Sequence, residues 1–306
     1  MIARKYFCLC LDPVHIGSGG YRLGAVDNTI VREPATGVPK IPGTSLAGAI
    51  RAYATYYLKH TSSGNAAKTG EDGETADSKI NRYFGTTEMQ GMVRIYDAQI
   101  LLFPVPSSNG TIWVTTHRLL SEWVNPKDVP WQDSKKVNEE YAYIAGWSGD
   151  ERKQYVDLGW VLLKVDNEGK GISQPDEKKE LVEFLTSRGL GFVDKVVCVS
   201  ERMFSNLVND NLEVRTSVKI DPETGASKEK ALFTYEAIPR GTVLAFEFTI
   251  DSNDQNECKG ALQAIEGSFK YLELLGVGGM STRGFGRVRI ARISKSNGSK
   301  EASQND

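Results

Sequence analysis

The sequence has no long hydrophobic run, few histidines and no strong charge of either sign. No stretch of about 18 consecutive apolar residues occurs, so we expect no helix that crosses a membrane. The N-terminal segment is too short and too polar for a secretory signal. The formal net charge of -2 argues against binding naked nucleic acid through bulk charge, but it leaves room for a local basic groove.

Cysteine is also scarce, and its spacing does not suggest a metal site. The chain has four cysteines, of which only Cys8 and Cys10 lie close together in the sequence. No second pair with metal-ligand spacing follows them. We therefore expect buried thiols in a reducing compartment, and a cytoplasmic location.

What the sequence does have is a mixture of strand and helix patterns around two glycine-rich loops. Alternating or continuous apolar residues predict strands at 4–11, 92–103, 111–120, 159–165, 212–220, 231–238, 241–250 and 287–293. Helical spacing predicts helices at 42–58, 176–189, 200–210 and 261–276, with Thr44 or Ser45 as the cap of the first and Gly276 at the end of the last. Because helices are interspersed among antiparallel-looking hairpins, we expect an α+β fold with a ferredoxin-like sheet.

Three polar segments interrupt or follow this pattern. Residues 60–79 are polar and glycine-rich, which indicates a flexible insertion. Residues 211–238 form a long predicted hairpin with a polar tip, because two strand patterns flank a Pro-Glu-Thr-Gly turn. The tail 294–306 is expected to be disordered.

The second glycine-rich loop, residues 276–286, has the composition of a phosphate-binding segment. Its five glycines allow backbone amides to approach a ligand closely, and Arg283 is followed by Arg287, Arg289 and Arg292 on the next strand. The loop precedes a strand and carries no Gly-Lys-Ser/Thr, so it is neither a dinucleotide fingerprint nor a P-loop. An ordinary helix-to-strand turn fits it as well.

The first glycine-rich loop, HIGSGGYRLGAVDN, runs from His15 to Asn28. It begins with one of the three histidines of the chain and ends near a lone carboxylate, Asp27. A phosphate-handling site, a catalytic loop and an ordinary turn all fit this composition. His15 could orient the loop, contact a phosphate or act as an acid.

These two loops, the segment PGTSLAGAIR and the hairpin sequence together resemble the RAMP superfamily of CRISPR-associated proteins. The similarity is to the repeated backbone subunit of type III effector complexes, in its type III-B or Cmr-type version. The start of the helix, Pro-Gly-Thr-Ser-Leu followed by Gly-Ala-Ile-Arg, is the most specific part of the resemblance.

The resemblance implies an RNA-guided endoribonuclease that works within an assembled complex. It implies one RRM-like domain over residues 1–293, with the hairpin at about 211–238 as a thumb that flips a nucleotide out of the guide–target duplex. It also implies cleavage of target RNA beside that nucleotide by an aspartate with a divalent metal such as Mg²⁺. The implied partners are the guide RNA (crRNA), single-stranded target RNA, copies of the chain in a head-to-tail filament and other type III effector subunits.

The resemblance and the residue patterns together suggest roles for individual residues. Asp27 is the catalytic residue and metal ligand, while His15 and Glu236 are further catalytic candidates. The thumb residues are Phe233 and Tyr235. The RNA-binding residues are Gly17, Ser18, Gly19, Arg22, Thr44, Ser45, Gly48, Arg51, Gly278, Gly279, Ser281, Thr282, Arg283 and Arg287. Many relatives have a lysine after the Ser-Leu pair, where this chain has Ala47.

Three other functions remain compatible with the sequence. The chain could be a catalytically inert guide-binding subunit, which would bind guide without cutting target. It could be a guide-processing RAMP endoribonuclease, which would cut repeat RNA in EDTA through histidine chemistry. It could also be an enzyme for a phosphate-bearing small molecule, which would have a small pocket and no affinity for RNA.

Overall fold

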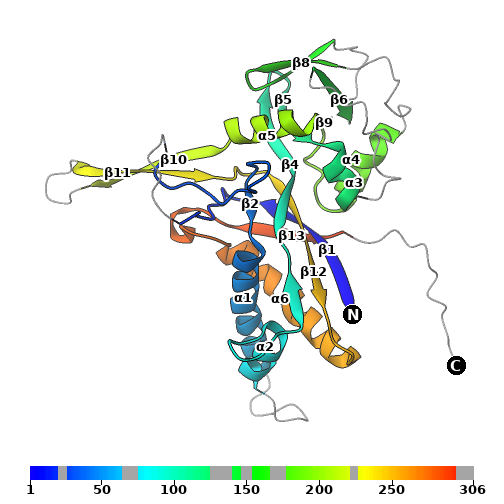
Figure 1. The fold of residues 1–306 in the computed structure, drawn as a ribbon, viewed down its shortest axis with the longest axis vertical. Helices are drawn as coiled ribbons and strands as arrows, with labels where there is room; N and C mark the ends of the chain where they lie inside the picture. The colour runs from blue at the N-terminus through cyan, green and yellow to red at the C-terminus, as the bar shows by residue number, and fades with distance from the viewer. Residues whose placement is uncertain are drawn as a thin grey trace.

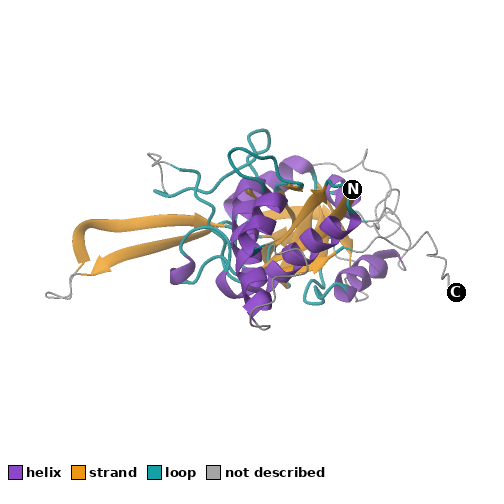
Figure 2. Ribbon diagram, turned by 90° about the horizontal axis from the view of Figure 1, so that it is seen from below, coloured by secondary structure: helices purple, strands orange, loops and turns teal. Residues whose placement is uncertain are grey.

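The computed structural model describes residues 1–19, 26–63, 75–124, 140–145, 154–165, 177–220 and 227–293. Helices and strands are mixed, and one hairpin projects from the body of the molecule (Figures 1 and 2). The strands are β1 (Ile2–Cys10), β2 (Lys40–Ile41), β3 (Val93–Ile95), β4 (Ala98–Ser107), β5 (Gly110–Thr115), β6 (Tyr141–Ala145), β7 (Tyr155–Leu158), β8 (Val161–Val165), β9 (Val196–Cys198), β10 (Glu213–Ile220), β11 (Ser227–Ala237), β12 (Val243–Ile250) and β13 (Val288–Arg292). The helices are α1 (Gly43–Ser63), α2 (Ala76–Phe84), α3 (His117–Trp123), α4 (Glu177–Ser187), α5 (Glu201–Asp210), α6 (Gln255–Leu275) and the short 3-10 helix η3 (Ser281–Arg283).

The described strands form an 11-stranded sheet and a separate two-stranded hairpin. The main order of the sheet is β13-β1-β12-β4-β5-β9-β6-β8-β7, with β2 added to β4 and β3 added to β12. Neighbouring strands are antiparallel, apart from the parallel pairs β5–β9 and β6–β8. The predicted mixture of helices and strands is therefore confirmed.

The strand β1 lies inside the sheet, between β12 and β13. Phe7 pairs with Ala245 on one side and with Ala291 on the other. A strand with neighbours on both edges and cover on both faces needs apolar side chains at nearly every position. This explains why the sequence Tyr-Phe-Cys-Leu-Cys at its end is fully buried.

Helices α1 and α6 lie side by side next to this part of the sheet (Figure 1). Gly267 of α6 makes their close approach possible, because a Cβ there would lie 2.6 Å from the ring of Tyr57. Tyr6 of β1 stacks on Phe246 and Phe248 and meets the edge of the Phe269 ring from α6. These aromatic contacts join the helix pair to the sheet.

Several predicted boundaries were wrong. The strand predicted at 111–120 ends at Thr115, and α3 follows, because the Thr116 hydroxyl accepts a hydrogen bond from the Leu119 amide and caps a helix. The strand predicted at 92–103 is two strands, β3 and β4. Helix α6 begins at Gln255, before the predicted position 261, because Asp254 caps it.

The polar insertion predicted at 60–79 is helical at both ends. Helix α1 continues to Ser63, and α2 begins at Ala76 with Thr75 as its cap. Residues 64–74 lie outside the described residues, and so does the tail 294–306. No helix in the described ranges is both long enough and apolar enough to cross a membrane.

The four cysteines are free and buried, as the sequence predicted. Burial raises the pKa of the Cys8 thiol to about 12. Burial also raises the pKa of the Cys10 and Cys198 thiols, so these three are inert packing groups at neutral pH.

The hairpin of β10 and β11 extends away from the sheet and the helices (Figure 2). Its register pairs Arg215 with Tyr235 and Ser217 with Phe233, with an irregularity between Val218 and Ile220. We call residues 233–237, where β11 meets the body, the hairpin root. Asp27, His15 and Arg283, which are described below, each contact this root.

Candidate functional site

The N-terminal loop lies against the hairpin root. Val14 forms a bridge with Ile238, and Asn28 forms one with Tyr235. The Asn28 amide donates to the Thr234 carbonyl at 3.0 Å, and the Asn28 carbonyl accepts from the Glu236 amide at 3.0 Å. The backbone around Asp27 is therefore fixed beside β11 as a short additional strand would be.

Asp27 is bound directly to Thr234 of the root. Its Oδ2 accepts hydrogen bonds of 2.9 Å from both the amide and the hydroxyl of Thr234, and its own amide donates to that hydroxyl at 2.8 Å. The backbone and side-chain hydrogen bonds from Thr234 lower the pKa of the Asp27 carboxyl. Asp27 is therefore a carboxylate at neutral pH, half-exposed beside the projecting hairpin.

His15 is buried in the same root. Its Nδ1 donates to the Glu236 carbonyl oxygen at 2.6 Å, because a carbonyl can only accept. Its ring meets the ring of Tyr235 edge to face, with centroids 6.0 Å apart. When the imidazole is neutral, Nε2 is the nitrogen without a proton.

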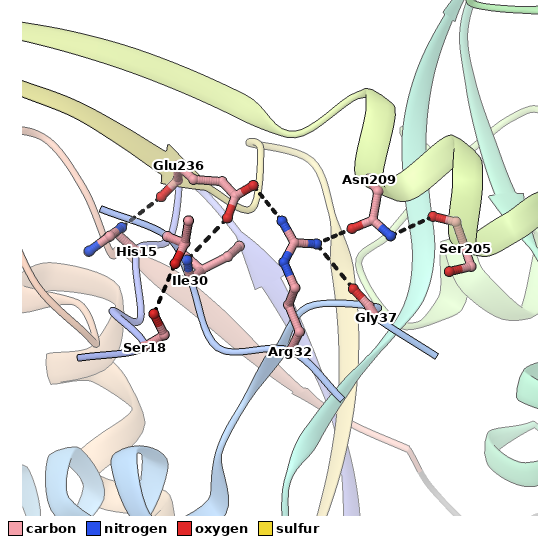
Figure 3. Close-up of polar contacts among 9 residues, drawn as sticks. His15, Ser18, Ile30, Arg32, Gly37, Ser205, Asn209 and Glu236 are labelled. Carbon is pink, nitrogen blue, oxygen red and sulfur yellow. Dashed lines mark hydrogen bonds and ion pairs between the residues drawn. The ribbon is translucent and has the colours of Figure 1, made fainter. Parts of the chain in front are cut away.

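Glu236 joins the loop to the body of the protein (Figure 3). Its Oε2 accepts from the Ile30 amide at 3.1 Å, and its Oε1 pairs with the Arg32 guanidinium. Arg32 also donates to Asn209 of α5 and to the Gly37 carbonyl. Both carboxylate oxygens of Glu236 are engaged, so this geometry favours a positioning role over that of a second catalytic carboxylate.

The second glycine-rich loop reaches the root from another direction. The Gly279 amide donates to the His15 carbonyl at 2.9 Å. A Cβ at Gly278 would lie 2.5 Å from that same carbonyl oxygen, and φ of +87° there also favours glycine. Only glycine allows the two loops to meet this closely.

The tip of this second loop is exposed next to the root. Ser281, Thr282 and Arg283 form η3 and are exposed. The Arg283 guanidinium donates to the Tyr235 hydroxyl at 3.2 Å. Tyr235 therefore lies between His15 and Arg283, and it contributes to the root as well as to the hairpin face that it shares with Phe233.

Two arginines predicted to bind RNA already have protein partners. Arg287 forms an ion pair with Asp12 at 2.5 and 3.1 Å, and its hydrogen bond lowers the pKa of the Asp12 carboxyl. Arg51 donates to the Gly85 carbonyl at 2.8 Å and to the Asn81 side chain at 2.9 Å, which ties α1 to α2. Arg283, whose described partner is a neutral hydroxyl, keeps its full charge for a ligand.

The cap predicted for the first helix was wrong. Helix α1 begins at Gly43, and the Gly43 amide donates to Asp97 Oδ1 at 2.7 Å. Thr44 and Ser45 lie in the first turn instead of at the cap position. A carboxylate distant in the sequence already occupies this helix end, which weakens it as an anion site.

The remaining predicted RNA contacts lie on the surface. Thr44 and Gly48 are exposed on α1, and a Cβ at Gly48 would meet nothing within 4 Å. Gly17, Ser18 and Gly19 are exposed, with the Ser18 hydroxyl 2.9 Å from the Thr29 hydroxyl. Arg22 lies outside the described residues. The roles of these residues stay predictions.

The candidate site offers one carboxylate, Asp27, as a possible metal ligand. No group of three or more His, Cys, Asp or Glu side chains that could hold a metal occurs in the described part of the chain. Mg²⁺ commonly keeps several waters and takes only one or two protein carboxylates together with substrate phosphates. Asp27 fits that pattern if the nucleic acid supplies the other oxygens.

Sequence reasoning missed the residues that hold the site together. Thr234, Arg32 and Asn209 were not selected, although each contacts a selected residue or joins one to the body. One signal was available, because Thr234 and Glu236 alternate with Phe233 and Tyr235 and so share the opposite face of the strand. Nothing in the sequence pointed to Arg32 or Asn209.

Comparison with known proteins gives a consistent result. The sequence profile of the RAMP superfamily matches residues 7–289. The CRISPR system Cmr endoribonuclease Cmr4 of Pyrococcus furiosus is 28% identical over 294 residues, which cover 92% of each chain.

Solved structures share the fold. The crystal structure of oligomeric Cmr4 from Pyrococcus furiosus superposes with a TM-score of 0.61 and 20% identity, over 96% of this chain and 100% of that one. A subunit of the type III-B Cmr-beta complex bound to cognate target RNA superposes with a TM-score of 0.67 and 16% identity, over 95% and 97% of the two chains. The match of the superfamily profile along nearly the whole chain leads to one conclusion: this protein belongs to the RAMP superfamily.

Proposed function

We propose that this chain is an endoribonuclease subunit of a type III CRISPR effector complex, which binds guide RNA and cleaves the paired target RNA. The observation that carries the proposal is the position of Asp27, an ionised carboxylate fixed at the root of a projecting hairpin. The name of the relative from Pyrococcus furiosus, an endoribonuclease of a Cmr system, supports the same activity.

The strand order supports an RRM-like core within a single domain of residues 1–293. Four neighbouring strands of the sheet lie in the order β13, β1, β12 and β4. Numbered along the chain among these four, they are the fourth, first, third and second strands. Helix α1 connects the first to the second, and α6 connects the third to the fourth. This is the order of the split βαβ arrangement, with the hairpin inserted before the third strand.

The proposed cleavage of RNA requires an in-line arrangement of the reacting atoms and stabilisation of the phosphate charge. RNA carries its own nucleophile, the 2′-hydroxyl. It gives its proton to a water molecule as its oxygen attacks the adjacent phosphorus, the bond from phosphorus to the 5′ oxygen breaks, and that oxygen takes up a proton from water. Stacked A-form RNA does not place these atoms in line. We propose that the hairpin displaces one nucleotide and so allows the in-line arrangement beside Asp27.

Asp27 would hold a divalent cation such as Mg²⁺, which supplies charge stabilisation for the phosphate when it is bound. The lowered pKa of Asp27 suits a ligand that stays ionised, and it makes this carboxylate a weak proton acceptor. His15 orients the loop through Nδ1. In the neutral ring Nε2 has no proton, so it would accept a hydrogen bond from a 2′-hydroxyl and would not donate one to a phosphate oxygen.

The exposed tip of the second loop supports binding of the RNA backbone. Arg283 supplies charge, and Ser281 and Thr282 supply hydroxyl donors next to the root. Copies of the chain would stack head to tail along the guide, because a heterologous contact of this kind produces an open filament. The oligomeric Cmr4 crystal structure and the Cmr-beta complex with target RNA are consistent with these partners.

The test is cleavage of target RNA by a complex assembled on a defined guide. Asp27→Asn removes the charge and should lower the cleavage rate by about 10²- to 10⁴-fold with unchanged target binding. Asp157→Asn is a matched control, because Asp157 also accepts backbone and side-chain hydrogen bonds, from Ser107 and Ser108, away from the root. EDTA should abolish the wild-type reaction.

Equal cleavage by wild type and Asp27→Asn would overturn the assignment of the catalytic residue. A second candidate function, an inert guide-binding subunit, is favoured by one observation: the bonds between Asp27 and Thr234 would also serve as a purely structural clamp. A wild-type complex that binds target and leaves it intact would select that candidate.

A further inference from the structure

Thr234 makes an unusually complete set of contacts with the loop that carries Asp27. Its amide and hydroxyl both donate to Asp27 Oδ2, its hydroxyl accepts from the Asp27 amide, and its carbonyl accepts from the Asn28 amide. The Asn28 side chain also donates to that carbonyl at 3.3 Å. Every polar group of Thr234 is therefore used to hold residues 27 and 28.

The hydroxyl has a function that the backbone cannot replace. Any residue except proline at position 234 would offer an amide to Asp27. The hydroxyl adds a second donor to the same carboxylate oxygen, and at the same time it satisfies the Asp27 amide. Two donors on one oxygen, together with the fixed backbone, restrict the rotation of the carboxylate and leave its other oxygen directed elsewhere.

Thr234 is also part of the hairpin itself. It lies on β11 opposite Thr216 of β10, so the same strand that holds Asp27 continues into the projecting hairpin. The root is braced by further contacts, from Glu236 to Arg32 and from Tyr235 to Arg283. The carboxylate is therefore bound directly to the strand that forms the hairpin.

We propose that Thr234 is a positioning residue, which ties the Asp27 carboxylate to the hairpin and so determines which phosphodiester bond is cut. This inference rests on the proposed function, because it concerns the reaction assigned to Asp27. Its physical basis is that a carboxylate free to rotate would spend less time near one phosphate and more time near its neighbours. Loss of the hydroxyl should therefore change both the rate and the position of cleavage.

The experiment compares Thr234→Val, Thr234→Ser and wild type in complexes assembled on the same guide. Valine keeps the shape of threonine without the hydroxyl, whereas serine keeps the hydroxyl. The readouts are the single-turnover rate at saturating complex, the affinity for target RNA, and the cut positions mapped at single-nucleotide resolution. We expect Thr234→Val to lower the rate by about 10- to 100-fold, to spread the cuts over neighbouring bonds and to leave target affinity unchanged.

Thr234→Ser should recover most of the rate and the single cut position. Thr242→Val is the matched control, because the Thr242 hydroxyl donates to the Pro239 carbonyl at 2.8 Å without contacting Asp27. It removes one threonine hydrogen bond near the root and should leave cleavage as in wild type. A further readout without RNA is hydrogen exchange at the Asp27 amide, which should be faster in Thr234→Val and unchanged in Thr242→Val.

The outcomes separate the inference from the function on which it rests. If the wild type cuts and Thr234→Val cuts at the same rate and position, the positioning role is wrong and the proposed function stands. If Thr234→Val and Thr242→Val lose rate equally, the effect is one of general stability and the inference is again wrong. If the wild-type complex binds target without cutting, the proposed function and this inference fail together.

Discussion

The two glycine-rich loops meet at the same hairpin root but are held there by different forces. The first loop is held by hydrogen bonds to β11, which include those between the Asp27 carboxylate and Thr234 and that between the His15 ring and Glu236. The second is held by close backbone packing, which glycine alone permits at position 278. Side-chain bonds fix the direction of a functional group, whereas backbone packing fixes the course of a loop and leaves its side chains exposed. The first loop is therefore suited to chemistry and the second to contact with a ligand.

The largest effect is expected from a substitution that adds atoms where the two loops meet, which tests whether close backbone packing holds the second loop. Gly278→Ala adds a Cβ 2.5 Å from the His15 carbonyl oxygen at a φ of +87°. Strain and overpacking together should lower the free energy of unfolding by about 2–5 kcal/mol. Urea unfolding of the free protein measures this loss.

Gly284→Ala is the control for the first prediction. Gly284 has a similar φ of +81°, but a Cβ there would meet nothing within 4 Å. It should cost only about 1–2 kcal/mol, the penalty for a left-handed residue. Equal losses in the two variants would mean that the loops are not tightly packed at Gly278.

Arg283 of the second loop and Arg287, which follows it, should differ in how much each contributes to the salt dependence of RNA binding. Arg283→Ala should reduce the slope of RNA affinity against salt by about 1, because no acidic side chain among the described residues pairs with its charge. Arg287→Ala should change that slope less, since Asp12 already neutralises Arg287. Affinity for guide RNA at several salt concentrations measures both. Equal slopes for the two variants would contradict the difference in pairing.

The smallest expected effect is a pH dependence of stability at the outer ends of the loops. Asp12 precedes the first loop and Arg287 follows the second, and the hydrogen bond from Arg287 lowers the pKa of the Asp12 carboxyl. A carboxyl whose pKa is lowered on folding stabilises the protein above its unfolded pKa of about 3.9 and loses that contribution as the pH falls through the folded value. The stability difference between wild type and Asp12→Asn should therefore be present at pH 6 and shrink below about pH 4. A constant difference across this range would show that the ion pair does not form in solution.

Local patterns were sufficient to predict much of the fold. The buried strand β1, the end of α6 at Gly276 and the long hairpin each follow from residues adjacent in the chain. The prediction failed where one side chain decides between two structures, as at Thr116, whose hydroxyl starts a helix inside an apparent strand. The cap of α1 could not be predicted at all, because Asp97 comes from a distant strand connection.

In the candidate site, too, some residues could be selected from local sequence patterns and others could not. Asp27, His15, Tyr235 and Arg283 were selected from the sequence, and the structure brings them to one root. Their chemical roles stay predictions. Thr234, Arg32 and Asn209 were not selected, because their importance depends on contacts across more than half of the chain. Strand alternation indicates the face on which Thr234 lies, but it does not identify Asp27 as its partner.

Asp27 and Thr234 are 207 residues apart in the sequence. A ribosome must therefore have synthesised most of the chain before the carboxylate can reach the strand that orients it. Closing so large a loop is slow compared with forming local helices and turns. A chain that ends before β11 lacks Thr234, so the arrangement around Asp27 can form only after most of the protein has been synthesised.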